Sequence, residues 1–195
     1  NDLLSHEEVK PLVQEIQPDY IFHLAAQSLV RPSYEDPLTT FKVNSLGTAH
    51  ILESVRSFSK KVNIVLITSD KSYDNIELER GYEETDVLGG KDPYSASKGM
   101  AELVIKSYFH SFLKDNNFIR LAVTRAGNVI GGGDWARDRI VPDCVRAWAE
   151  KKKPEIRNPD ATRPWQHVLE PLGGYLLLGA LLSENNNFNG EAYNF

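Results

Sequence analysis

The chain has 195 residues, of which 41% are hydrophobic and 25% charged, and its formal net charge is −5. This composition is typical of globular domains, and its mildly acidic balance gives no electrostatic reason to expect nucleic acid or an anionic membrane as partner. The single cysteine, Cys144, excludes an internal disulfide framework and favours a cytoplasmic location, and no apolar run is long enough to span a bilayer.

The first third of the chain alternates helical and strand patterns. Ser5 and Glu8 form a capping-box pattern that predicts a helix at the start of the chain. Two short apolar runs predict buried strands, and the segment between them repeats at the helical period. The two strands are expected over residues 19–26 and 61–68, and the helix over residues 39–57.

A polar segment over residues 74–91 predicts a long loop that leads into a helix. Asp92 supplies its N-cap and Pro93 its first-turn proline, so the helix is expected to run to about residue 114. Further along, the patterns predict a strand over 119–125, a loop over 127–138, helices over 140–150 and 171–182, and a final strand at the end of the chain.

Strands that are apolar on both faces and alternate with helices predict an α/β fold, with a doubly wound parallel sheet of Rossmann type. The alternation weakens after Gly127. We therefore expect an NAD-binding domain over residues 1–127 that lacks its first βαβ unit, and a mixed, truncated substrate-binding region over residues 128–195. Because the first residue is not methionine, we expect the chain to be part of a longer parent protein.

Tyr94 and Lys98 are four residues apart in a capped helix and so lie on the same helical face. A lysine ammonium one turn away favours the phenolate, and would bring the tyrosine pKa towards working pH. This pair predicts a proton-abstracting site. Taken alone, the spacing is more often that of an amphipathic surface pair.

A second polar group follows the strand over residues 61–68. Ser69, Asp70 and Lys71 stand at its carboxyl end, which is the edge where open parallel sheets bind ligands. An ordinary polar turn is the alternative. His23, inside the first predicted strand, is expected to be a packed strand residue rather than a ligand or base.

Five motifs occur in the order and spacing of the extended short-chain dehydrogenases, which the chain resembles over nearly its whole length. They are His23-Leu-Ala-Ala-Gln27, Val43-Asn-Ser-Leu-Gly-Thr48, Ile67-Thr-Ser-Asp-Lys71, Tyr94-Ser-Ala-Ser-Lys98 and Arg125-Ala-Gly-Asn128. Within this family, the chain is most similar to the CDP-glucose 4,6-dehydratases at Ser69-Asp-Lys71 and in the segments 127–135 and 163–168.

The resemblance implies a role for each matching residue. Tyr94 would take the proton of the sugar 4-hydroxyl while NAD receives the C4 hydride, and Lys98 would tune Tyr94 and hold the nicotinamide ribose. Ser69 would bind the same hydroxyl, and Asp70 would protonate the hydroxyl that leaves C6. The cofactor would also be lined by Leu24, Ala25, Ala26, Gln27, Asn44 and Thr68.

For the substrate, the resemblance implies that Asn128 and Arg163 hold the nucleotide diphosphate. Lys71 departs from many dehydratases of the family, which have a glutamate there as base for the C5 proton. The lysine would need a strongly lowered pKa to serve as that base, or it orients the substrate instead. The identity of the base stays open.

Two alternatives remain beside the CDP-glucose dehydratase. One is another nucleotide-sugar enzyme such as a 4-epimerase, which would not need Asp70. The other is a non-catalytic NAD(P)-binding protein of the same fold. The 195 residues contain no Gly-x-x-Gly-x-x-Gly loop, so we expect the chain alone to be inactive and to bind NAD poorly. We also expect a homodimeric parent and no metal site.

Overall fold

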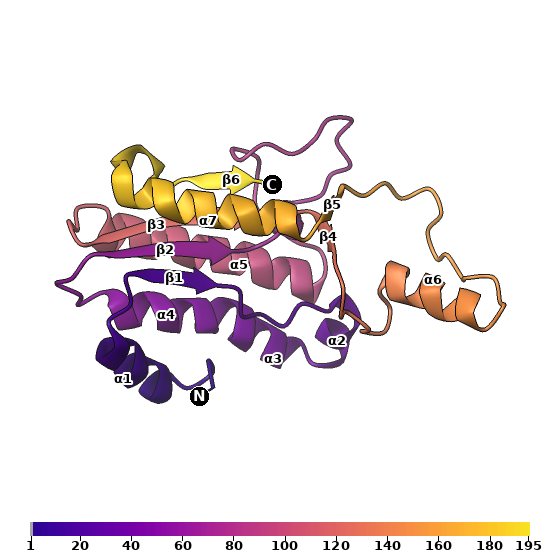
Figure 1. Cartoon of the computed structure of the whole chain (residues 1–195), viewed down its shortest axis with the longest axis horizontal. Helices are drawn as coiled ribbons and strands as arrows, with labels where there is room; N and C mark the ends of the chain where they lie inside the picture. The colour runs from indigo at the N-terminus through magenta and orange to yellow at the C-terminus, as the bar shows by residue number, and fades with distance from the viewer. Residues whose placement is uncertain (1) are drawn as a thin grey trace.

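The computed structural model describes residues 2–195, and its centre is a sheet of four parallel strands. These are β1 (Tyr20–His23), β2 (Val62–Ile67), β3 (Ile119–Arg125) and β6 (Ala192–Asn194), in the spatial order β1-β2-β3-β6. The arrows of β1, β2 and β6 point the same way in Figure 1, and β3 pairs in parallel with β2 and β6, so the carboxyl ends of the strands meet at one edge of the sheet.

Helices cover both faces of this sheet (Figure 1). On one face lie α4 (Gly47–Val55) and α5 (Pro93–Tyr108), with α1 (His6–Ile16) packed against α4; on the other lies α7 (Leu169–Glu184). Six shorter helical segments lie between these elements: α2 (Val30–Glu35), α3 (Pro37–Phe41), η1 (Lys42–Leu46), η2 (Asp70–Ser72), η3 (Phe109–Leu113) and η4 (Asn186–Phe188).

Strand β2 shows why the sheet needs two layers of helices. Ile64 and Leu66 point into the core formed with α4 and α5, whereas Val65, between them, points into the core formed with α7. Successive strand side chains alternate between the two faces of a sheet, so a strand that is apolar at every position must be covered twice. The prediction of a doubly wound, Rossmann-type α/β fold is confirmed.

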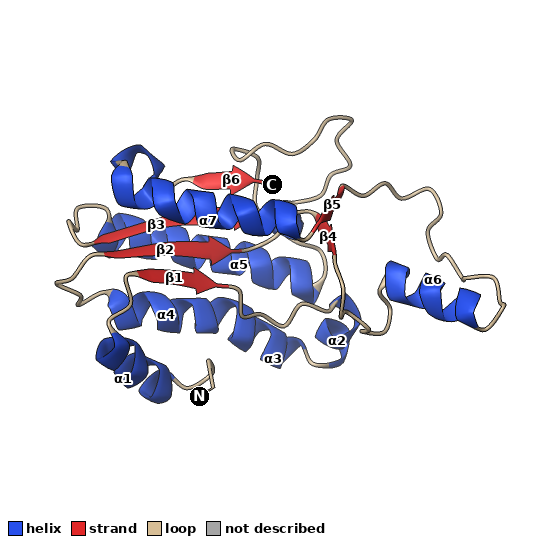
Figure 2. Ribbon diagram, in the orientation of Figure 1, coloured by secondary structure: helices blue, strands red, loops and turns tan. Residues whose placement is uncertain are grey.

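The segment after β3 differs from its prediction as a loop. Residues 128–130 form β4 (Asn128–Ile130), which pairs in parallel with β5 (Trp165–His167) in a separate two-stranded sheet. Figure 2 shows the intervening arm, which carries α6 (Ile140–Ala149), extending away from the main sheet. The pairing partner of β4 is more than thirty residues away in sequence, which a local pattern does not reveal.

Residues beyond 127 are not all remote from the main sheet, because α7 and β6 return to it. The predicted division into regions 1–127 and 128–195 stays a prediction.

The Ser5 hydroxyl, expected to cap α1, makes no capping hydrogen bond, and the Glu8 carboxylate accepts instead from the backbone N–H of Asp2. Within residues 2–195, no helix has both the length and the apolar character needed to cross a bilayer.

Candidate active site

The turn that follows β2 is held by its own side chains. The Ser69 hydroxyl donates to Asp70 Oδ1 at 2.9 Å and accepts from the backbone N–H of Lys71 at 3.2 Å. The backbone N–H of Asp70 donates to the carbonyl of Ala126 at 3.0 Å, which fastens the turn to the end of β3. Three residues predicted to be catalytic therefore share one short turn at the carboxyl edge of the sheet.

Tyr94 enters this region from the first turn of α5. The Asp92 carboxylate accepts from the backbone N–H of Ser95 at 3.0 Å, so the helix starts where the cap and Pro93 predict. Tyr94 is 8% exposed, and the Ser69 hydroxyl lies near enough to its phenol to influence the pKa of that phenol. The phenol thus points into the protein and meets the Ser69 turn.

The pKa of Tyr94 shifts in the direction opposite to the one predicted. Burial raises the pKa of the phenol, the hydrogen bond from Ser69 opposes this rise, and the nearby Asp70 carboxylate adds to it. Without a bound ligand, the protonated phenol is the favoured form.

Lys98 lies on the same face of α5 and is only 6% exposed. Burial lowers the pKa of its ammonium to about 8, although the negative charge of Glu102 opposes that shift. On β1, burial and the Lys98 charge together lower the pKa of His23 to about 4. His23 is a buried strand residue, as the sequence predicted. It is neutral near pH 7, and its Nε2 lies 3.1 Å from the Thr48 hydroxyl.

Asn44 joins the loop after β1 to α5. Its amide accepts from the backbone N–H of Gln27 at 2.8 Å, and donates to the Gln27 carbonyl at 3.0 Å and to the Ser97 hydroxyl at 2.8 Å. The Gln27 side chain turns back to Leu29 and Thr40. Both residues were predicted to line a cofactor, and here their side chains brace the backbone around that place.

The other residues predicted to line the cofactor differ in exposure. Leu24 is 52% exposed, Ala25 is exposed and Ala26 is half-buried, so they lie at the accessible carboxyl end of β1. Thr68 is buried, and its hydroxyl donates to the Glu102 carboxylate at 2.5 Å. Thr68 is therefore tied to α5 through its side chain.

The two residues predicted to bind the diphosphate are brought together by the small sheet. Asn128 pairs with Trp165, and its backbone N–H donates to the carbonyl of Pro164 at 2.9 Å. Arg163 is the next residue before Pro164, and its side chain is exposed. Parallel pairing of β4 with β5 thus places Asn128 opposite Trp165, with Arg163 two residues before that strand partner.

Sequence reasoning missed three charged residues of this region. Arg139 lies close enough for its charge to oppose the rise in the Tyr94 pKa. Glu102 and Arg125 form a buried ion pair, with Arg125 Nε 2.8 Å from Glu102 Oε1. Glu102 stands four residues after Lys98, so its helical spacing was a signal that could have been read.

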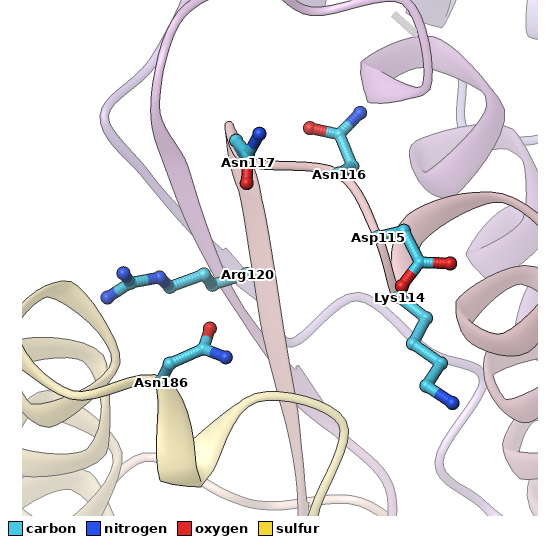
Figure 3. A pocket seen from close by; sticks show the side chains of 6 residues that line it. All are labelled: Lys114, Asp115, Asn116, Asn117, Arg120 and Asn186. Carbon is cyan, nitrogen blue, oxygen red and sulfur yellow. The ribbon is translucent and has the colours of Figure 1, made fainter.

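A polar depression lies elsewhere on the molecule, beside the turn that leads from η3 into β3 (Figure 3). It is at the amino end of β3 and thus at the sheet edge opposite Ser69. It is lined by Lys114, Asp115, Asn116, Asn117, Arg120 and Asn186.

Over residues 2–195, no group of three or more histidine, cysteine, aspartate or glutamate side chains is placed to hold a metal ion.

Known proteins resemble the chain in sequence and in fold. It is 46% identical over its full length to the CDP-glucose 4,6-dehydratase of Salmonella typhimurium, of which it covers 55%. It superposes with a TM-score of 0.82 and 21% identity on a double mutant of the dTDP-glucose 4,6-dehydratase DesIV from Streptomyces venezuelae, determined with NAD bound. The epimerase Mth375 from Methanothermobacter thermautotrophicus gives a TM-score of 0.83 at 26% identity.

All of this chain is covered in both structural superpositions, whereas it covers 56% of each of those two proteins. The chain thus spans about half the length of the relatives that it matches. A family model described as GDP-mannose 4,6 dehydratase matches residues 1–186. That match extends from the first predicted helix to the end of α7, and the chain belongs to this family.

Proposed function

We propose that the protein containing this chain is an NAD-dependent hydro-lyase that converts CDP-glucose to CDP-4-keto-6-deoxyglucose. The observation that carries this proposal is the meeting of the Tyr94 phenol with the Ser69–Asp70 turn at the carboxyl edge of the sheet. An acid next to the residue that would take the proton of the 4-hydroxyl is what a dehydratase needs and an epimerase does not. The 46% identity to a CDP-glucose 4,6-dehydratase supports the choice of nucleotide.

The residues at the sheet edge suit a nicotinamide cofactor. Small and exposed residues follow β1, where a ligand can approach the backbone. The Lys98 ammonium is buried with no hydrogen bond contributing to its pKa, so its donors remain available for a ribose hydroxyl. When bound, NAD would accept the hydride from C4 and return it to C6.

The chain's own residues would carry the proton transfers. Tyr94 would take the proton of the 4-hydroxyl, while Ser69 holds that hydroxyl by a hydrogen bond. The resulting 4-ketone acidifies the C5 proton, and Asp70 would protonate the hydroxyl that leaves C6. Lys71 is half-buried in the same turn and would orient the sugar or act as the base for C5.

Asn128, at the start of β4, and Arg163, two residues before β5, would hold the nucleotide diphosphate, because a guanidinium offers paired donors to phosphate oxygens. The substrate-binding region would then centre on the small sheet and the arm that carries α6, within the proposed residues 128–195. Residues 1–127 would form the NAD-binding domain.

We also propose that the full-length protein is a cytoplasmic homodimer that serves lipopolysaccharide O-antigen synthesis. A lone, free cysteine suits the reducing cytoplasm. The helix face that carries Met100 and Leu103, 44% and 58% exposed, offers apolar surface for a second copy.

The test is a panel of CDP-, dTDP-, UDP- and GDP-sugars incubated with the full-length protein and NAD, with products identified by mass and NMR. We expect a product lighter than CDP-glucose by one water. A product of unchanged mass with inverted C4 would assign the protein to the 4-epimerases instead. Absence of any conversion, with NAD still bound, would favour a non-catalytic NAD-binding protein.

A further inference from the structure

Glu102 is a buried carboxylate that the proposed reaction does not use. It lies on α5, one helical turn after Lys98 and two turns after Tyr94, so all three side chains leave the same face of the helix. Its side chain is 3% exposed. An ionised carboxylate at such a position is tolerated only when its charge and its oxygens are satisfied by partners.

Arg125, at the end of β3, neutralises this charge with two parallel hydrogen bonds. Its Nε donates to Glu102 Oε1 and its Nη2 to Glu102 Oε2, both at 2.8 Å. Such a bidentate pair restricts the guanidinium and the carboxylate to one plane and one distance. The pair therefore fixes the position of α5 relative to strand β3 of the sheet that the helix covers.

The same carboxylate holds the start of the Ser69 turn by a hydrogen bond and lies beside its end. Before the turn, the Thr68 hydroxyl donates to Oε1 at 2.5 Å. After it, the Ser72 hydroxyl lies 3.4 Å from Oε1 while donating to the Ser69 carbonyl at 2.7 Å. Ser69, Asp70 and Lys71 are enclosed between these two contacts.

Arg125 extends the network into the loop that precedes α5. Its Nη1 donates to the Tyr73 hydroxyl at 2.8 Å and to the Glu84 carbonyl at 3.0 Å, and its guanidinium stacks 4.8 Å from the centre of the Tyr73 ring. The Tyr73 hydroxyl in turn donates to Asn194 Oδ1 at 2.7 Å. Helix, turn, loop and two strands thus meet at one ion pair.

We propose that Glu102 is a positioning residue, whose carboxylate fixes the turn bearing Ser69, Asp70 and Lys71 at a set distance from the helix bearing Tyr94 and Lys98. The inference rests on the proposed function, since it concerns the alignment of those five residues. A buried ion pair is poor evidence for stability, and its best-attested use is to select one arrangement among several. Acid and base must both be correctly placed for elimination across C5 and C6.

Glu102 also acts on Lys98 directly. The charged or titratable groups that interact with the Lys98 ammonium are the Glu102 carboxylate on the same helix and His23 on β1. Because the negative charge of Glu102 opposes the lowering of the Lys98 pKa by burial, its removal would let the pKa fall further below 8.

The test compares Glu102→Gln and Thr68→Val with a control, Glu53→Gln, in the full-length protein. Glu53 also forms a carboxylate–arginine pair, with Arg56 at 2.7 Å, but on α4 and away from the Ser69 turn. We expect Glu102→Gln to lower kcat about 10²-fold, as misplacement of catalytic groups by about 1 Å does, with KM changed less than about threefold. The alkaline limb of its pH–rate profile should move to lower pH.

Thr68→Val keeps the Glu102 charge and removes the contacts of the Thr68 hydroxyl with Glu102 and with the Thr124 carbonyl, so it should lower kcat without moving the alkaline limb. Glu53→Gln should change neither quantity. Glu102→Gln protein that folds with unchanged kcat and an unmoved limb would overturn the proposal. If Glu102→Gln does not fold, Thr68→Val decides, because wild-type kcat in that variant would refute the positioning role.

Hydrogen exchange separates this inference from the proposed function. Within the turn, the amides of Asp70 and Ser72 donate to the carbonyls of Ala126 and Ser69, at 3.0 Å in each case. Glu102→Gln should speed their exchange while amides of α4 keep wild-type rates. This result would support the positioning role even if wild type converted no nucleotide sugar, and unchanged exchange would contradict it even if the enzyme were active.

Discussion

Ser69 donates its only hydroxyl proton to the Asp70 carboxylate, with 2.9 Å between Ser69 Oγ and Asp70 Oδ1. A hydroxyl has one proton to donate, so Ser69 can donate to Asp70 or to a Tyr94 phenolate but not to both at once. The Ser69 hydroxyl lies near enough to the phenol to oppose the rise in its pKa that burial causes. The two groups proposed as acid and base, Asp70 and Tyr94, are thus linked through one serine.

Asp70→Asn should separate oxidation from elimination. The Asp70 charge raises the Tyr94 pKa, so its removal lowers that pKa and leaves the phenolate easier to form. We expect C4 oxidation to persist, while elimination slows about 10²- to 10⁴-fold for loss of the general acid. Single-turnover absorbance of the reduced nicotinamide, with product mass, measures both steps. Equal loss of both steps would rule out the acid role of Asp70.

His23 should make the fold sensitive to acid. Its pKa is lowered from 6.5 to about 4 in the folded protein, so between these pH values the unfolded state binds more protons. The stability contribution is complete above pH 6.5 and is lost as pH falls to about 4, by about 3 kcal/mol in total. Urea unfolding across this range should show the loss, and His23→Asn should flatten it. Equal slopes for both proteins would contradict the burial-driven shift.

Lys98→Met should abolish turnover yet stabilise the protein. Burial disfavours the ammonium enough to lower its pKa from 10.5 to about 8, and methionine fills similar space without a charge. At pH 7 the lysine is protonated in both states and the penalty is fully present, so the variant should gain about 1–3 kcal/mol in the free energy of unfolding. Denaturant melts measure this gain. A loss of stability would mean that the attraction between the Lys98 and Glu102 charges stabilises the folded protein by more than burial of the ammonium destabilises it.

Gly99 should be indispensable for the approach of α5 to the Ser69 turn. A Cβ at this position would lie 2.8 Å from the carbonyl oxygen of Gly89 and 3.4 Å from that of Ser72. Gly99→Ala should lower the free energy of unfolding by about 1–3 kcal/mol, as overpacking does. Gly81→Ala is the matched control, since nothing lies within 4 Å of its added Cβ. Thermal melts that shift equally for both variants would contradict this reading of the contact.

Several features followed from sequence because their causes are local. Continuous apolar runs predicted buried parallel strands, and Asp92 with Pro93 predicted the start of α5. The four-residue spacing of Tyr94 and Lys98 then placed both on one helical face, and both side chains are buried as that reading required. The strand prediction also placed Ser69, Asp70 and Lys71 directly after a strand, at the carboxyl edge of the sheet, where the structure has them.

Only the tertiary structure decided the pKa values of the residues on that face of α5 and the side chains that hold the face in place. Tyr94 has a raised pKa because its neighbours are a buried core and Asp70, which the helix spacing could not reveal. Asn44 reaches Ser97 across 53 residues, and Arg125 reaches Glu102 across 23. Helix and strand periodicity is set by neighbours along the chain, whereas burial and charge pairing depend on residues that only folding brings together.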